Sequence, residues 1–260
     1  RGLMNNLKFT ILGSGCSFGV PYPGNHWGKC DPSNPKNRRM RCSLLVQSDT
    51  TNIVVDTGQD FREQTNINEI KYIDAVLYSH KHPDHTAGID DMRMFAIRVQ
   101  NTIPAYMDDT TYEYLARAKD YLIKQENIAY PPIITPHILS GYETFSVGDI
   151  DVSTHILDHG TINSTGFRFG DVAYSLDMKD IHDERTFTAL EGIGAWIVDA
   201  GGFESSENPV HASFEHIMNL NKRIKAKRVI FTSHTNHIDY DTISAQLPDG
   251  YELAYDGQVL

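Results

Sequence analysis

Apolar and polar residues alternate along the chain in short blocks, and the blocks predict strands and helices in turn. Short apolar runs that end in glycine or polar residues are typical of buried strands. Two longer segments, residues 110–124 and 211–224, repeat apolar residues every three or four positions, which predicts amphipathic helices. The expected strands are residues 7–13, 52–58, 75–79, 149–157, 165–170, 171–177 and 228–234.

The first of these helices has a defined apolar face and a predicted start. Leu115, Ala118 and Leu122 fall on one face. Thr110 and Glu113 have the spacing of a capping box, in which each side chain binds a free backbone N–H at the helix start.

The order of these elements predicts the fold class. Strands and then a helix are followed by more strands and a second helix, which indicates an α/β sandwich of two similar halves. The proline-containing segment 130–138 is expected to be a connection and not a linker between domains. We therefore expect residues 1–260 to form a single domain, for which this length is sufficient.

Composition and charge limit the classes of molecule that the protein is expected to bind. The 23 basic and 34 acidic side chains give a formal charge of −11, which argues against duplex nucleic acid and membrane surfaces as partners. A small anionic ligand is compatible with this charge, because bound metal reverses the local sign. Three cysteines without C-x-x-C spacing indicate a reducing compartment, so we expect a cytoplasmic protein. We see no signal peptide or membrane span, and we expect Met4 to be the native start after an expression remnant.

The stretch YSHKHPDHTAG concentrates imidazole and carboxylate groups directly after an apolar run. His80, His82, Asp84 and His85 cannot share a face on a regular strand or helix, but a turn at a strand end can bring them together, and the proline within the stretch fits a turn. These donors suit divalent ions such as zinc, manganese and iron. The simplest interpretation is that two of these side chains bind one ion and the other two bind a neighbouring ion. A solvated histidine-rich turn is the alternative.

The longer stretch SHKHPDHTAGIDDMR resembles the H-x-H-x-D-H signature of the metallo-β-lactamase superfamily, and its GIDDMR tail is similar to the PhnP-type cyclic phosphodiesterase branch. Further motifs follow in the same order over nearly the whole chain. LGSGCSFGVP resembles the branch's first turn, and NIVVDTG, ILDHG, AYSLDM and FTSHTNHIDY resemble the superfamily's first, third, fourth and last motifs. LPDGYELAYDG resembles the branch's ending. The resemblance implies a four-layer αββα sandwich and a metal-dependent hydrolase.

The resemblance also implies two divalent ions per chain, zinc or manganese, or else iron. By position, the ligands of the first ion are His80, His82 and His159, those of the second are Asp84, His85 and His234, and Asp177 is the bridging carboxylate. Two ions about 3.5–4 Å apart need a shared anionic oxygen. A hydroxide between them is a nucleophile near neutral pH. Asp56, in the first motif, would brace the metal loop.

Three of these positions have an alternative. His155 shares a strand face with His159, but His159 belongs to the DHG that matches the motif. His237 competes with His234, which lies at the end of its predicted strand. Asp177 has the alternative role of a turn or N-cap residue. We prefer His159, His234 and a bridging Asp177.

His211 opens the second predicted helix, and a helix N-terminus attracts anions. In the phosphodiesterase branch a histidine at this place contacts the scissile phosphate. The resemblance therefore implies phosphate binding by His211, with protonation of the leaving oxygen as a further role. His211 and Asp84 are the expected catalytic residues. An ordinary helix-start histidine is the alternative for His211.

Two weaker features lie near the N-terminus. The turn GSGCS, residues 13–17, is either a phosphate cradle or only a turn. The basic cluster Arg38–Arg41 is either a solvated approach to the sheet or a clamp on an anionic substrate or second subunit. The branch often carries a cysteine-rich zinc knuckle here. This chain has only Cys30 in that segment, so we expect no structural zinc.

These features predict a binuclear metal-dependent phosphodiesterase. The expected ligands are small cyclic nucleoside or ribose phosphates and nucleoside monophosphates, and a homodimer is an open expectation. A tRNA 3′-processing endonuclease would need a basic arm that the sequence lacks. A thioester or lactone hydrolase would not need His211. A PqqB-type carrier often lacks metal ligands, whereas all seven positions are filled here.

Overall fold

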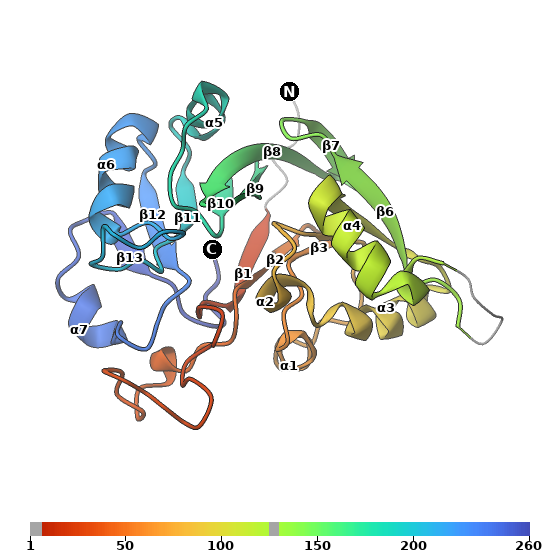
Figure 1. Ribbon diagram of the computed structural model, residues 1–260, viewed down its shortest axis with the longest axis horizontal. Coiled ribbons are helices and arrows are strands. Elements are labelled where there is room, and N and C mark those ends of the chain that lie inside the picture. The colour runs from red at the N-terminus through yellow and green to blue at the C-terminus, as the bar shows by residue number, and fades with distance from the viewer. Residues whose placement is uncertain (1–6, 125–129) are drawn as a thin grey trace.

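Two β-sheets pack face to face, and helices cover the outer face of each (Figure 1). This computed structural model describes residues 7–124 and 130–260, so the expected native start at Met4 lies outside the described residues. The first sheet has six strands in chain order, and the second has seven in the order β13-β12-β11-β10-β9-β8-β7. The layers confirm the αββα sandwich expected from the sequence.

The N-terminal half builds the first sheet and the helices on it. The strands are β1 (Lys8–Gly13), β2 (Ser43–Gln47), β3 (Asn52–Val55), β4 (Ala75–Leu77), β5 (Ile103–Asp108) and β6 (Ile134–Leu139). The helices are α1 (Phe61–Ile67), α2 (Pro83–Thr86), α3 (Met92–Val99) and α4 (Asp109–Ala118), with 3-10 turns η1 (Pro35–Asn37), η2 (Ile89–Asp91) and η3 (Asp120–Leu122). Strands β1 to β3 are antiparallel, and β3 to β6 are parallel.

The C-terminal half builds the second sheet in the same manner. The strands are β7 (Thr144–Val147), β8 (Ile150–His159), β9 (Ile162–Phe169), β10 (Val172–Ser175), β11 (Ala195–Asp199), β12 (Arg228–Thr232) and β13 (Tyr251–Leu253). The helices are α5 (Glu184–Leu190), α6 (Phe214–Ile224) and α7 (Tyr240–Ser244). Strands β7 to β10 are antiparallel, and β10 to β13 are parallel.

Three apolar layers hold the sheets and helices together. Strand β11 is apolar up to its last residue because both of its faces are covered. Ile197 points into the layer between the sheets, and Trp196 and Val198 point into the layer under the helices. All three side chains are fully buried. A strand that is covered on both faces has no solvent side, so it reads as a continuous apolar run instead of an alternating one.

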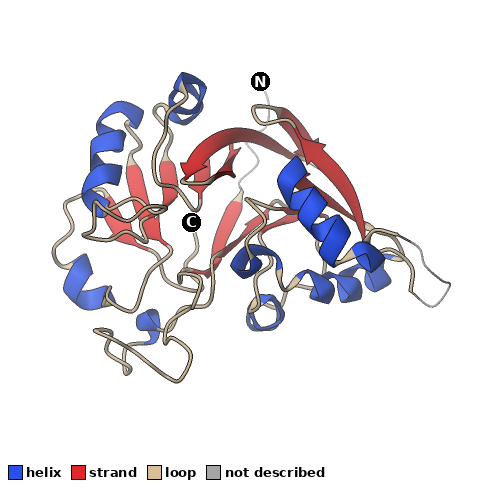
Figure 2. Cartoon of the chain, in the orientation of Figure 1, coloured by secondary structure: helices blue, strands red, loops and turns tan. Residues whose placement is uncertain are grey.

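The candidate site residues lie at one edge of the sandwich. The carboxyl ends of the parallel strands meet at that edge, and β8 runs in the same direction as β10 because both are antiparallel to β9. Loops and the short helix α2, not strand interiors, carry most of the site residues. Figure 2 shows how loops connect the strands and helices. By strand, Asp56 follows β3, His80 follows β4, His159 ends β8, Asp177 follows β10, Asp199 ends β11 and His234 follows β12.

The predicted capping box of the first helix is wrong. Helix α4 begins at Asp109, and Asp108 is its N-cap, whose carboxylate accepts a hydrogen bond from Thr111 N at 3.0 Å. Asp108 ends β5 in an extended conformation, so its side chain reaches the free N–H groups first. The helix ends at Ala118, which is exposed, and Leu122 lies in the separate turn η3.

The second helix also begins later than predicted. Helix α6 starts at Phe214, and the N-cap Ser213 accepts a hydrogen bond from His216 N. Serine is a preferred N-cap, because its hydroxyl satisfies a free N–H of the first turn. His211 therefore lies in the loop before the helix and does not open it.

The segment 130–138 is not only a connection, because its second half forms β6, which is the edge strand of the first sheet. Pro136 lies within this strand, and an edge strand tolerates proline because one side of it needs no partner. The sequence interpretation also missed β2, β5, β7, β11, β13 and the shorter helices. Among the helices the structure describes, none is long and apolar enough to cross a bilayer.

Candidate metal centre

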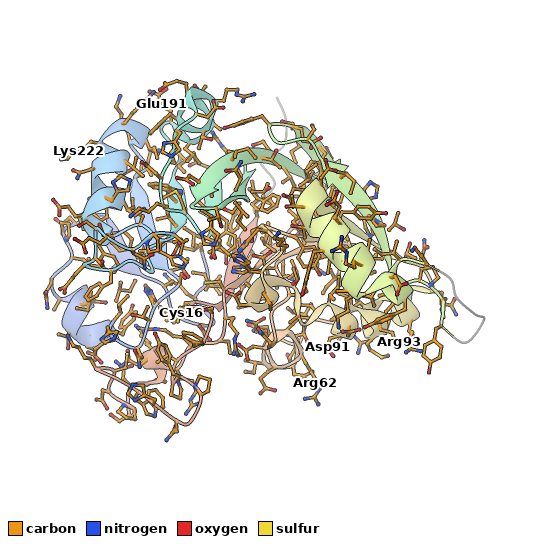
Figure 3. All side chains as sticks on the ribbon, viewed as in Figure 1. Cys16, Arg62, Asp91, Arg93, Glu191 and Lys222 are labelled. Carbon is orange, nitrogen blue, oxygen red and sulfur yellow. The ribbon has the colours of Figure 1, made fainter. Side chains whose placement is uncertain are left out.

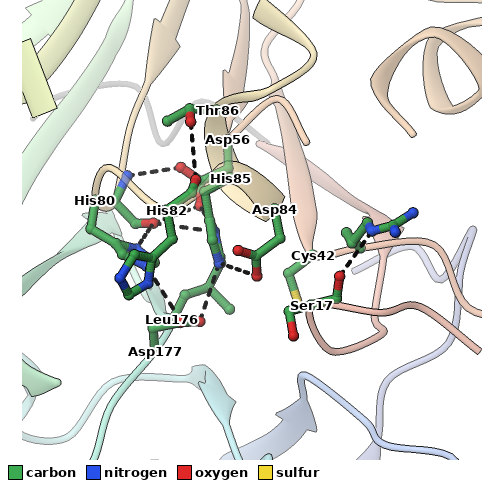
Figure 4. A network of polar contacts seen from close by, with 12 residues as sticks. Ser17, Cys42, Asp56, His80, His82, Asp84, His85, Thr86, Leu176 and Asp177 are labelled. Atoms are coloured by element: carbon green, nitrogen blue, oxygen red, sulfur yellow. Dashed lines mark hydrogen bonds and ion pairs between the residues drawn. The ribbon is translucent and has the colours of Figure 1, made fainter. Parts of the chain in front are cut away.

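Six of the seven predicted metal ligands form two overlapping groups of side chains. Figure 4 shows five of them, His80, His82, Asp84, His85 and Asp177. Within each group the donor atoms lie within 4.8 Å of one another. The first group is His80, His82, His159 and Asp177, and the second is Asp84, His85 and Asp177. Asp177 belongs to both groups, as a bridging carboxylate would.

The two oxygens of Asp177 face different groups. Its Oδ2 lies 3.4 Å from Nε2 of His80 and 3.2 Å from Nε2 of His159. Its Oδ1 lies 3.3 Å from Nε2 of His85, and this nitrogen is also 3.2 Å from Oδ2 of Asp84. The backbone of Asp177 has a positive φ of 48°, which is unusual for a residue other than glycine. Ser164 Oγ donates to its carbonyl oxygen at 3.1 Å and helps to hold this conformation.

Asp56 holds the histidine loop in place through hydrogen bonds, as the first motif led us to expect. It is fully buried, and its carboxylate accepts hydrogen bonds from Ser79 N, Ser79 Oγ and His85 Nδ1 at 2.7–2.8 Å. The bond to Nδ1 directs Nε2 of His85 toward Asp84 and Asp177. Such a contact to the far nitrogen is a common way of orienting a metal-binding histidine.

Burial gives most of the first group the protonation state that metal binding requires. Burial lowers the pKa of His80, and burial together with His80 and His159 lowers the pKa of His82 to about 4. Burial raises the pKa of Asp177, but His85 and His80 outweigh this effect and hold it well below its usual range. Burial also lowers the pKa of His159 and of His85, but Asp177 outweighs burial and raises both. Divalent ions bind neutral imidazoles and ionised carboxylates, so an ion at this donor set would replace the protons on these two rings.

His159, and not His155, belongs to the cluster. His159 Nδ1 donates to the carbonyl oxygen of Val210 at 2.9 Å, which leaves Nε2 for Asp177. His155 is buried elsewhere, where its Nε2 lies 2.9 Å from Ser175 Oγ. The same hydroxyl accepts a hydrogen bond from Trp196.

His234 lies outside both groups, but its environment suits a ligand. The side chain is fully buried, and neither ring nitrogen makes a hydrogen bond of normal geometry in the described part of the chain, although the backbone of Phe231 and Ala254 lies beside the ring. Because the structure does not bring His234 into either group, its role as a ligand stays a prediction. Burial also lowers the pKa of His234 well below its usual value and keeps the ring neutral. His237, its competitor, is exposed.

His211 lies beside the cluster and is paired with Asp199, a residue that the sequence interpretation missed. The His211 Nδ1 atom is 2.6 Å from Oδ2 of Asp199, and its ring centre is 5.4 Å from that of His159. Burial lowers the pKa of His211, but the charge and hydrogen bond of Asp199 outweigh this effect and raise it to about 9. Asp199 therefore favours the protonated form of the ring.

Asp199 is held by the backbone around it. It is fully buried and accepts hydrogen bonds from Met178 N at 2.8 Å and Gly201 N at 2.9 Å. Its sequence context, WIVDAGG, repeats the pattern of NIVVDTG around Asp56: an aspartate directly after a buried apolar strand and shortly before glycine. That repeat was the signal from which Asp199 could have been predicted.

Comparison with known proteins identifies the family. The family model for the Beta-lactamase superfamily domain matches residues 51–234, which is more than half of the chain. A crystal structure of a diphosphatase from the PhnP family superimposes with a TM-score of 0.87 at 30% identity, covering 98% of this chain and 96% of that one. The chain belongs to the metallo-β-lactamase superfamily, in its PhnP-type branch. With its His/Asp cluster, it is a metal-dependent hydrolase.

Two further relatives of this superfamily member match nearly the whole chain. An octanoyltransferase from Porphyromonas gingivalis is 26% identical over 253 residues, which are 96% of this chain and 51% of that protein. The chain thus spans about half the length of the curated relative it matches. Zinc-bound PqqB from Methylobacterium extorquens superimposes with a TM-score of 0.72 at 18% identity, over 97% of this chain and 99% of that one. This level of identity shows a shared fold alone.

The glycine-rich turn of this PhnP-type protein is not a free phosphate cradle. Ser14 N donates to Asp256, Gly15 N to the carbonyl of Met40, and Cys16 N to the carbonyl of His234. Cys16 marks this turn, in the loop after β1, in Figure 3. Because these three N–H groups already have partners, the turn serves to attach the His234 loop to the first sheet.

The basic cluster Arg38–Arg41 is solvated only in part, because Arg38 is exposed whereas Arg39 is buried. Arg39 is only 2% exposed, and its guanidinium donates to the carbonyl oxygen of Ile238 at 2.7 Å. Arg41 pairs with Asp60 at 3.0 Å. These contacts hold loops together, and the alternative of a clamp on an anionic substrate or a second subunit stays untested for the cluster.

Proposed function

We propose that this hydrolase is a phosphodiesterase that uses two divalent ions, zinc or manganese, to cleave small cyclic nucleoside or ribose phosphates. The residues that would hold the ions are His80, His82, His159, Asp84, His85 and His234, with Asp177 between them. When bound, such ions neutralise phosphate charge and lower the pKa of a coordinated water, which then serves as the nucleophile.

The observation that carries this proposal is the His211–Asp199 pair. Nδ1 of His211 is bonded to Asp199, so Nε2 of His211 is the nitrogen that remains for a ligand. The positive charge of the ring suits an anionic phosphate oxygen, and its proton can pass to the leaving oxygen. A thioester or lactone carbonyl is neutral and gains less from a fixed positive charge. The PhnP-family diphosphatase, a protein named for phosphorus chemistry, supports the same choice.

Thioester hydrolysis is the second candidate, because the curated relative is named an octanoyltransferase. An octanoyl thioester is therefore the most informative competing substrate. The net charge of −11 argues against tRNA as substrate. The filled ligand positions argue against a PqqB-type carrier. We retain a cytoplasmic location and a homodimer as parts of the proposal.

The test is a turnover screen of zinc- and manganese-loaded protein. The substrates are 2′,3′- and 3′,5′-cyclic nucleotides, a cyclic ribose phosphate, a pre-tRNA and an octanoyl thioester. We expect phosphodiester cleavage to dominate. Preferred cleavage of the thioester would overturn the proposal.

His211→Ala tests the role of the pair directly. We expect kcat and kcat/KM to fall together by about 10²–10⁴-fold on a cyclic nucleotide, because its alkoxide leaving group needs a proton. An aryl phosphodiester should lose much less, since its leaving group is stable without one. Metal content should not change, because His211 is not a proposed ligand. Equal losses on both substrates would remove the proton-transfer role, and no loss on either would contradict the phosphodiester assignment.

A further inference from the structure

A cavity of about 600 Å³ lies between the two sheets, lined by residues from both of them and by none of the proposed metal ligands. Its inner wall is the β8–β9 pair, in which Ile156 lies opposite Thr165 and Asp158 lies opposite Asn163. Side chains alternate along a strand, so these four residues share the face that carries the inter-sheet core nearby. The cavity is therefore the open end of the layer between the sheets.

One sequence neighbour and one backbone contact link this cavity to the metal ligands. Asp158 is the residue before His159, and Thr165 N donates to the carbonyl oxygen of Ser79, the residue before His80. A substrate held by the cluster would extend its organic group into this space.

The charges around the cavity are mostly negative. Four of its 13 lining residues are aspartates, against one arginine. That arginine, Arg185, is already paired with Asp183 at 2.7 Å and lies over the ring of Tyr142 at 4.0 Å. The carboxylate of Asp109, the first residue of α4, is exposed and makes no hydrogen bond or ion pair within residues 7–124 and 130–260. The surplus charge would repel a second phosphate on the ligand.

The cavity also offers an unused hydrogen-bonding group. Thr165 is only 4% exposed, and its hydroxyl has no partner among the residues the structure describes. The side-chain amide of Asn163 lies on the same face and is exposed. A hydroxyl-rich ligand would satisfy both groups.

We propose that this cavity binds the organic group of the phosphodiester and selects a hydroxyl-rich group without a second negative charge, such as an unphosphorylated nucleoside. The proposal rests on the phosphodiesterase function proposed above. It narrows the substrates to diesters in which the scissile phosphate is the sole anion.

The test compares 2′,3′-cyclic AMP with the same molecule carrying a 5′-phosphate. We expect the wild type to prefer the first by kcat/KM, and the preference to shrink at high salt as charges are screened. Asp109→Lys should reduce the preference on the order of tenfold. Glu215→Lys is the matched control, because it makes the same charge change at an exposed first-turn position of α6, outside the cavity. It should leave the preference unchanged.

Thr165→Val provides a second test that needs no charge change. Loss of one ligand hydrogen bond should raise KM for 2′,3′-cyclic AMP about fivefold with little change in kcat. Equal kcat/KM for the two nucleotides, or equal effects of Asp109→Lys and Glu215→Lys, would overturn the cavity proposal while the phosphodiesterase function stood. Cleavage of the octanoyl thioester with neither nucleotide turned over would overturn the function itself, and the cavity proposal with it.

Discussion

At the scale of single residues, Asp177 is the side chain on which the proposed metal centre most depends. It is 5% exposed, and its oxygens lie within 3.4 Å of nitrogen donors from both groups. Those donors come from loops of both sheets, so no neighbouring residue can replace it.

Asp177→Ala should release at least one of two bound ions, because the shared ligand is lost. We expect metal per chain, measured by plasma mass spectrometry after dialysis, to fall from about two, the number of a shared-carboxylate site. Asp241→Ala, on α7 and outside the cluster, is the control and should retain full metal. An Asp177→Ala protein with full metal and activity would contradict a binuclear site.

Asp199 sets the charge of His211, and this predicts a pH effect. Asp199→Asn keeps the shape of the side chain but removes the charge that holds the pKa of His211 near 9. The ring should then lose its proton at a lower pH. Because the charged ring is the active form, the alkaline decline of kcat/KM should also move to lower pH.

The measurement is the pH profile of kcat/KM on a 2′,3′-cyclic nucleotide. Asp171→Asn is a suitable control, since Asp171 precedes β10 and binds Gly194 N away from the site. If the Asp199→Asn profile matched the wild type, His211 would not be the group that titrates.

At the scale of elements, the helix starts differ most from the sequence interpretation. A capping box is a pattern of two residues, whereas the N-cap is decided by where the preceding strand ends. Asp108 ends β5 and Ser213 follows the loop that carries His211, so each reaches free N–H groups that the sequence pattern assigned elsewhere.

Asp108→Ala should lower the free energy of unfolding by about 1 kcal/mol, the usual cost of removing an N-cap. Glu113→Ala is the matched control on the same helix and should change it little, since Glu113 makes no capping bond. Urea denaturation of the two variants measures these changes and shows which residue caps the helix. A larger loss for Glu113→Ala would restore the capping box.

At the scale of the whole molecule, the candidate ligands join the two halves. His80, His82, Asp84 and His85 come from the first sheet's side, and His159, Asp177 and His234 come from the second. Ions bound between them would stabilise the packing of one half on the other.

Metal addition to chelator-treated protein should therefore raise Tm. A ligand that binds only the folded state contributes about 2.7 kcal/mol at 100 times its Kd. Calorimetry with zinc and with manganese measures the shift. His82→Ala in the same experiment should reduce it, and a wild-type Tm that does not respond to saturating metal would contradict sites that span the two sheets.

The sequence by itself determined the fold class, the histidine loop and the ligand types. Apolar runs such as NIVVDTG and RVIFTSH indicate strands that are buried on both faces. The motif H-x-H-x-D-H concentrates metal donors in one turn. Both are local properties of the sequence. Only the tertiary structure decided which distant residues meet. It placed His159 in the cluster and His155 in the core, paired Asp199 with His211, and buried Arg39 against the His234 loop. These outcomes depend on the order of the strands in the sheets and on which strands end at the same edge. A local stretch of sequence does not contain that information, because it does not reveal which distant strands become neighbours.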